Sequence, residues 1–216
     1  MTNKKVNKTS EEVVAEPSFF SKHWKKLSIG IGAVAVLCLG FVGYKKLVVE
    51  PRAQQAQEAI VATQDFIKQG EYDKALASAN SVIEEYGSTE SGNLAQLYAG
   101  IALYNQGKYQ EAVEALEKYD ETGSDVTDAE VLQAQGNCYA CLKQYDKAVA
   151  KLTAAADKAK NASLSPSYLI QAGEIYELAL NNKDKARECY QKAKDQYKTS
   201  YMVSSGEVDK YLERVK

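Results

Sequence analysis

The chain has 216 residues, of which 45% are hydrophobic and 26% are charged, a balance typical of a globular protein. Its formal net charge of −2 argues against nucleic-acid binding through overall electrostatics. A single histidine, His23, excludes metal sites that need several histidines. Lysines dominate residues 1–49 and acidic residues dominate 50–216, so a small basic head precedes a larger acidic body.

Residues 1–26 carry six lysines and three glutamates, and residues 1–21 are too short and polar to fold alone, so we expect a short disordered tail over 1–21 at the basic end of the chain. Leu27 to Tyr44 then contains no charged residue. At ~1.5 Å per residue this stretch spans roughly 27 Å, close to the ~30 Å hydrocarbon core of a bilayer. Trp24 and Tyr44 flank it, as interfacial aromatic residues do. We predict a single transmembrane anchor helix over residues 22–49.

The anchor is expected to be uncleaved and without a lipid. No small-residue cleavage site follows the apolar run, because Lys45 and Lys46 come next. Cys38 is preceded by Leu37 rather than by a small residue, which argues against lipid attachment. Lys22 and Lys25 belong to a basic cluster on the N-terminal side, and this favours an N-terminus in the cytoplasm and a body outside.

The body contains an internal repeat. The segment GKYQEAVEALEKY at 107–119 recurs in related form at 70–82, 143–155 and 181–193. Each copy has an alanine at the same place, and an amphipathic helix is predicted before each copy. The aligned alanines are Ala75, Ala112, Ala148 and Ala186.

This pattern resembles the tetratricopeptide repeat. Two copies match its small and aromatic positions closely: Gly100, Tyr104, Gly107, Tyr109, Ala112 and Leu116 in one, and Gly136, Tyr139, Tyr145, Ala148, Leu152 and Ala155 in the next. The first copy departs from it, with Thr63 where the others have glycine, and the fourth lacks the turn glycine and tyrosine. The resemblance implies an all-α tetratricopeptide-repeat solenoid of about four helix pairs over 50–202.

Local signals predict where some helices begin and end. Ser165 is expected to cap a helix that has Pro166 at its first position, and Asp128 is expected to cap the first helix of the third repeat. Val208 and Val215 are expected to share one apolar face. Residues 203–216 are therefore predicted to form a C-terminal capping helix.

The cysteines are the most suggestive chemical feature. Cys138 and Cys141 form a C-x-x-C pair, but both fall in the middle of a predicted helix, whereas redox pairs sit at a helix N-terminus. We interpret them as small packing residues, and a disulfide among Cys138, Cys141 and Cys189 stays open. The sequence shows no phosphate-binding loop and no dinucleotide-binding motif. We therefore predict no enzyme activity, no catalytic residues, no metal and no cofactor.

The resemblance implies a binding groove lined by the first helix of each repeat, suited to an extended or amphipathic peptide. The repeat's lysine, asparagine and arginine clamp for chaperone C-termini is absent, since its places hold residues such as Ile60, Tyr98 and Glu130. The residues predicted to line the groove are Ile60, Gln64, Ile67, Leu97, Ile101, Tyr104, Gln133, Asn137, Ala140, Ile170, Glu174 and Glu177.

The layout of basic head, anchor and repeat body resembles the YfgM-like family of bacterial inner-membrane proteins, which accompany the Sec translocon. The resemblance implies a periplasmic repeat domain whose partners are translocon subunits, periplasmic chaperones or newly exported chains, with no nucleic acid and no small-molecule substrate. The tract from Tyr86 to Ala95 also resembles repeat proteins that organise outer-membrane assembly or division, so an envelope scaffold is an alternative. A regulator acting through the cytoplasmic tail is a third.

Overall fold

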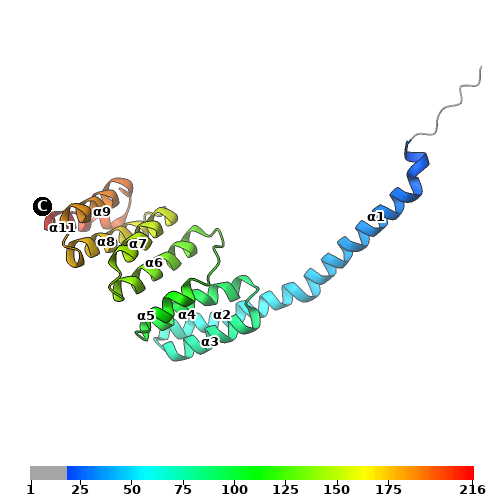
Figure 1. Ribbon diagram of the computed structural model, residues 1–216, viewed down its shortest axis with the longest axis horizontal. Helices are drawn as coiled ribbons and strands as arrows, with labels where there is room; N and C mark the ends of the chain where they lie inside the picture. Colours follow the sequence, from blue (N-terminus) through cyan, green and yellow to red (C-terminus); the bar gives the residue numbers. More distant parts are fainter. Residues whose placement is uncertain (1–18) are drawn as a thin grey trace, which may run out of the picture. The chain divides into compact units, whose positions relative to one another are not determined.

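The computed structural model describes residues 19–216, and this part of the chain consists of helices and turns without a strand (Figure 1). The chain divides into two compact units, Met1–Glu50 and Pro51–Lys216. The predicted tail falls mostly on residues 1–18, outside the described residues, and the first helix begins at Phe19.

The first unit contains α1 (Phe19–Tyr44), which continues as the π-helix η1 (Lys45–Val49). Within residues 19–216, this N-terminal stretch is the one helical segment apolar enough to cross a membrane. Its most apolar window is not buried against any other part of the protein, whereas the core helix of a soluble domain is mostly buried. Ile29, Leu37 and Phe41 are exposed accordingly. The helix therefore has the length and composition of a membrane anchor.

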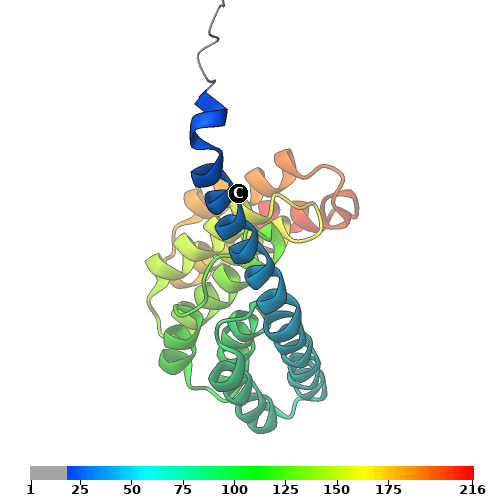
Figure 2. The ribbon, with the colours of Figure 1, turned by 90° about the vertical axis from the view of Figure 1, so that its right-hand side faces the viewer.

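The second unit is a series of helix pairs stacked in chain order (Figures 1 and 2). We call the first helix of each pair the A helix and the second the B helix. The pairs are α2 (Glu50–Gln69) with α3 (Tyr72–Tyr86), α4 (Glu90–Asn105) with α5 (Tyr109–Leu116), α6 (Asp125–Cys141) with α7 (Tyr145–Ala159), and α8 (Ser165–Glu174), which continues as the π-helix η2 (Ile175–Ala179), with α9 (Lys183–Gln196). Short helices α10 (Tyr201–Ser204) and α11 (Glu207–Arg214) follow.

Small residues on the A helices allow close packing within a pair. A Cβ atom built at Gly100 would lie 2.5 Å from Leu116 Cγ, and one at Gly136 would lie 2.8 Å from Leu152 Cγ. In the first pair Thr63 takes this place and is buried, and its hydroxyl lies 2.7 Å from that of Ser78.

The turn between A and B helices keeps its left-handed backbone even where glycine is missing. Gly70 and Gly107 have φ values of 74° and 78°. At the equivalent place in the third and fourth repeats, Lys143 and Asn181 have φ values of 59° and 48°. Residues other than glycine are strained in this region, so the later two repeats keep the turn at an energetic cost.

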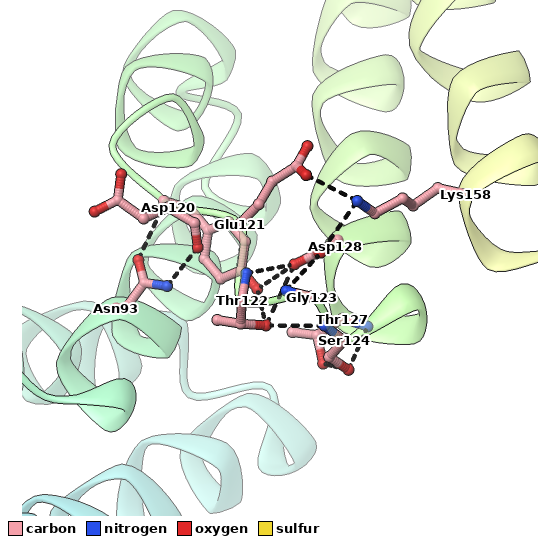
Figure 3. Close-up of polar contacts among 10 residues, drawn as sticks. Asn93, Asp120, Glu121, Thr122, Gly123, Ser124, Thr127, Asp128 and Lys158 are labelled. Atoms are coloured by element: carbon pink, nitrogen blue, oxygen red, sulfur yellow. Dashed lines mark hydrogen bonds and ion pairs between the residues drawn. The ribbon is translucent and has the colours of Figure 1, made fainter.

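Asp128 organises the connection between α5 and α6 (Figure 3). Its buried carboxylate accepts hydrogen bonds from the Tyr119 hydroxyl at 2.9 Å and from the backbone nitrogens of Thr122 at 3.0 Å and Gly123 at 3.2 Å. Lys158 on α7 lies 3.4 Å from the same carboxylate. The prediction that Asp128 caps α6 was wrong, because the helix begins at Asp125 and the cap is the residue before it, whose hydroxyl accepts from the Thr127 backbone nitrogen.

The cap predicted at Ser165 was also wrong, since Leu164 occupies the N-cap and Ser165 is the first residue of α8. Its buried hydroxyl donates to the carbonyl of Ala156 at 2.9 Å, which ties the start of α8 to α7. At the C-terminal end, α10 and α11 form two short helices instead of one. Val208 and Val215 are buried there against a core that includes Tyr190.

Candidate partner-binding site on the A helices

The predicted groove residues divide into two groups in the structure. Ile60, Leu97 and Ile170 are only 3%, 1% and 3% exposed, so these three side chains belong to the core and do not line an exposed surface. The other predicted positions are half-buried on the fourth A helix, its π-helical extension and the earlier A helices. These are Gln64, Ile67, Ile101, Tyr104, Gln133, Asn137, Ala140, Glu174 and Glu177.

The residue after each buried position reaches the surface instead. Val61 is exposed, and Tyr98 and Gln171 are half-buried. Gln64 on α2 donates a hydrogen bond to the Tyr98 hydroxyl on α4 at 2.6 Å, and Gln133 on α6 donates to the side-chain oxygen Oε1 of Gln171 on α8 at 3.4 Å. Polar side chains of neighbouring A helices therefore meet across the A-helix face, and two of them were missed by the sequence-based prediction.

Aromatic and sulfur groups gather at the C-terminal ends of α4 and α6. The ring of Tyr104 lies 5.5 Å from that of Tyr109, and the exposed Cys141 thiol lies 3.8 Å from the Tyr104 hydroxyl. Burial is the main cause that raises the pKa of Tyr104 to about 12. Tyr104 is therefore uncharged at neutral pH and offers a partner an aromatic surface with a hydroxyl donor.

A hollow of about 300 Å³ lies between the second half of α6 and the end of the fourth A helix. Leu178, on the π-helix η2, is 74% exposed at its edge. Most of the lining is apolar, and the polar groups are two side-chain amides and one carboxylate. The lining residues are Asn137, Ala140, Leu152, Gln171, Glu174, Ile175, Leu178 and Ala179. We call this hollow the α6–η2 pocket.

The acidic end of the face is partly occupied by the C-terminal helix. Glu177 accepts hydrogen bonds from Arg214 Nη2 at 2.7 Å and from the Tyr190 hydroxyl at 2.9 Å. The hydrogen bond from Arg214 is the main cause that lowers the pKa of Glu177. Glu174 lies further from the same guanidinium, at 3.9 Å, and accepts no hydrogen bond within the described part of the chain. Glu177 therefore holds α11, and Glu174 is the freer carboxylate.

The cysteines of the repeat body lie in different environments. Cys138 and Cys189 are buried and Cys141 is exposed, and all three are free thiols. Burial is the main cause that raises the pKa of the Cys138 thiol to about 12 and the pKa of Cys189 above its ordinary value. Both buried thiols stay protonated and packed at neutral pH.

Comparison with known proteins decides the family. A family model described as a tetratricopeptide repeat-like domain matches residues 17–208. The chain belongs to the tetratricopeptide repeat-like domain family. Among solved structures, the crystal structure of MamA protein is similar, with a TM-score of 0.52, 19% sequence identity, and coverage of 74% of this chain and 89% of that chain. A search of curated proteins gave no match. The expected all-α repeat solenoid is confirmed.

Proposed function

We propose that this tetratricopeptide repeat-like protein is a membrane-anchored scaffold that binds other proteins through its A-helix face. Domains of this type are generally protein-interaction modules without enzymatic activity. The observation that carries the proposal is the combination, in one chain, of this repeat fold with an apolar N-terminal helix that no other part of the protein buries. The anchor would comprise residues 22–49, the repeats 50–202 and the cap 203–216.

The finer proposal places the N-terminus in the cytoplasm, the anchor in the inner membrane and the repeats in the periplasm. The basic residues Lys22, Lys25 and Lys26 before the apolar run support this orientation. There the protein would act as an accessory of the Sec translocon that binds periplasmic chaperones or newly exported chains. Its resemblance in layout to the YfgM-like family supports this role.

The mechanism is tethering. A binding face fixed near the site where chains emerge meets them at a high effective concentration, so modest affinity suffices. Weak contacts also release a client quickly, because most differences in affinity lie in the dissociation rate. Such a scaffold needs an accessible face with polar and apolar positions and no reactive centre.

The test is co-purification from native membranes. A C-terminally tagged full-length protein is extracted in mild detergent, and its partners are identified by mass spectrometry against an anchor-swapped control. We expect translocon subunits and periplasmic folding factors, and we expect deletion of residues 1–49 to leave a folded helical body without them. Enrichment of outer-membrane assembly or division proteins instead would overturn the translocon role. Equal recovery of partners without the anchor would overturn tethering.

Orientation has a separate test that uses the exposed Cys141. A membrane-impermeant maleimide applied to intact spheroplasts should label Cys141 if the repeats lie outside the cytoplasm. The matched control is the Cys141→Ser variant, which should lose this label. Labelling only after the membrane is permeabilised would place the repeats in the cytoplasm.

A further inference from the structure

Lysine and arginine are unevenly distributed among the helices of the repeat body, and among the A helices they occur only on α2, as Arg52 and Lys68. Helices α4, α6, α8 and η2 contain no lysine or arginine. By contrast, the B helices α7 and α9 together carry eight lysines and arginines. The acidic residues on these A helices are Glu90, Asp125, Asp128, Glu130, Glu174 and Glu177. Any segment that lies along α4, α6 and α8 meets carboxylates and no cation of those helices.

The α6–η2 pocket has unused binding groups beside its apolar floor. The floor is made by Ala140, Leu152 and Ile175, and Leu178 forms an exposed apolar edge. Asn137 makes no side-chain hydrogen bond within residues 19–216, and Glu174 has only the distant Arg214 as a partner. An asparagine amide can donate to and accept from a peptide backbone, while a carboxylate takes a cation. The pocket therefore combines an apolar floor with an amide that can bind a peptide backbone and a carboxylate that can bind a cation.

The protein itself shows how a cation sits at this end of the face. The Arg214 guanidinium lies 4.8 Å from the centre of the Tyr211 ring while it donates to Glu177. An arginine can contact a carboxylate and an aromatic ring at the same time, because its guanidinium group is planar and weakly hydrated. A second basic group, supplied by a partner, would find Glu174 within the same acidic region.

We propose that the α6–η2 pocket binds a basic–apolar segment of a partner polypeptide: one large apolar side chain fills the pocket, and a neighbouring lysine or arginine pairs with Glu174. This inference rests on the proposed function and names the chemistry of the bound chain. Ligand pockets range over roughly 300–1,000 Å³, so a hollow of about 300 Å³ suits one anchoring side chain. The carboxylate of Glu174 disfavours an acidic segment at this pocket.

The test uses full-length protein in nanodiscs and the fluorescein-labelled peptide Ser-Gly-Arg-Leu-Phe-Arg-Gly-Ser, with binding measured by fluorescence anisotropy. One control peptide replaces both arginines by glutamate, and another replaces Leu-Phe by Ser-Ser. We expect each control peptide to bind at least about tenfold more weakly, which corresponds to about 1.4 kcal/mol. Equal binding of the three peptides would overturn the proposal.

Variants locate the site. Ala140→Leu fills the pocket, Leu178→Ser removes its exposed edge, and Glu174→Gln removes the charge. We expect each variant to bind the unmodified peptide several-fold more weakly. Glu188→Gln on the exposed face of α9 is the matched control and should bind normally. If Leu178→Ser and Glu174→Gln, with unchanged circular dichroism, bind like the original protein, the pocket is not the site. Partners that still co-purify with the original protein would then leave the scaffold proposal standing.

Discussion

The carboxylate of Asp128 on α6 and the ammonium of Lys158 on α7 lie 3.4 Å apart, and Lys158 also reaches Glu121 in the preceding loop at 2.8 Å (Figure 3). Asp128 is only 2% exposed, whereas Lys158 keeps contact with solvent. One buried acid thus joins the α5–α6 loop to the next B helix. Asp128 stabilises the fold more through the several hydrogen-bond donors it satisfies than through the ion pair with Lys158.

Replacing Asp128 by alanine should destabilise the repeat body. The Tyr119 hydroxyl and the backbone nitrogens of Thr122 and Gly123 would lose their acceptor. We expect the free energy of unfolding to fall by about 1–3 kcal/mol, measured by urea unfolding followed by circular dichroism. The control is Asp157→Ala, which removes an exposed pair with Lys192 and should cost less than about 1 kcal/mol. Equal losses in the two variants would contradict this account.

The same residue predicts a pH dependence. Burial acts to raise the pKa of Asp128, but hydrogen bonds from Thr122, Tyr119 and Lys158 outweigh it and hold the pKa below its ordinary value of 3.8. A carboxyl whose pKa is lower in the folded than in the unfolded chain stabilises the fold above the unfolded value, and this contribution disappears as the pH falls through the folded value. The stability difference between the original protein and Asp128→Asn should stay constant from about pH 7 to 5 and shrink below about pH 4. A stability difference that does not change with pH over this range would argue against a lowered pKa of Asp128 in the folded protein.

Gly173 should tolerate alanine less well than Gly136. A Cβ atom at Gly173 would lie 2.3 Å from Cε1 of the buried Tyr190, whereas one at Gly136 would lie 2.8 Å from Leu152 Cγ. A rigid ring cannot yield as a leucine can, so overpacking should cost about 1–3 kcal/mol at Gly173 and less at Gly136. Chemical denaturation of both alanine variants measures this. A stabilised Gly173→Ala protein would show that helix propensity outweighs the crowding.

Lys143→Gly should stabilise the third repeat. Lys143 has a φ of 59°, a conformation that glycine adopts without a steric penalty. We expect a gain of up to about 1 kcal/mol, because relief of strain exceeds the added freedom of the unfolded chain. Lys147→Gly, inside α7, is the matched control and should lose about 1 kcal/mol. Thermal unfolding of both variants shows whether each one gains or loses stability. A loss of stability in Lys143→Gly would refute the strain argument.

Thiol labelling should distinguish the cysteines. In a Cys38→Ser background, a maleimide should modify the exposed Cys141 in native protein and reach the buried Cys138 and Cys189 only after denaturation. The high pKa of Cys138 also keeps its thiolate population small. Mass spectrometry of digested protein identifies the modified residue. Rapid native labelling at Cys138 would mean that α6 opens readily.

Most of the fold could be predicted from the period of the repeat. Helix order and pairing followed from the recurring alanines and glycines, because close helix packing allows few other residues at those places. The left-handed turn between the A and B helices is present even where its glycine is missing, because Asn181 adopts the same conformation in the fourth repeat. The nine-residue span from Ser200 to Val208 was harder, since the two short helices there depend on a left-handed Gly206 and on packing against α9.

The binding face was less predictable. Whether Leu97 or Tyr98 reaches the surface depends on how α4 rotates against α6, and one sequence does not reveal that rotation. The α6–η2 pocket includes Ile175, Leu178 and Ala179 of the π-helix, and the repeat pattern does not predict a π-helix there. The role of Glu177 required knowing that Arg214, far along the chain, returns to it.

The C-terminal helix also occupies one side of the last helix pair. A solenoid grows by placing each new helix pair on the exposed side of the last one, and two unprotected ends of similar shape can join copies end to end. Here α11 covers α9: Val208 and Val215 lie in the same buried cluster as Tyr190, and Arg187 donates to the carbonyl of Val215. The surface of α9 that α11 covers is therefore not free to receive another helix pair.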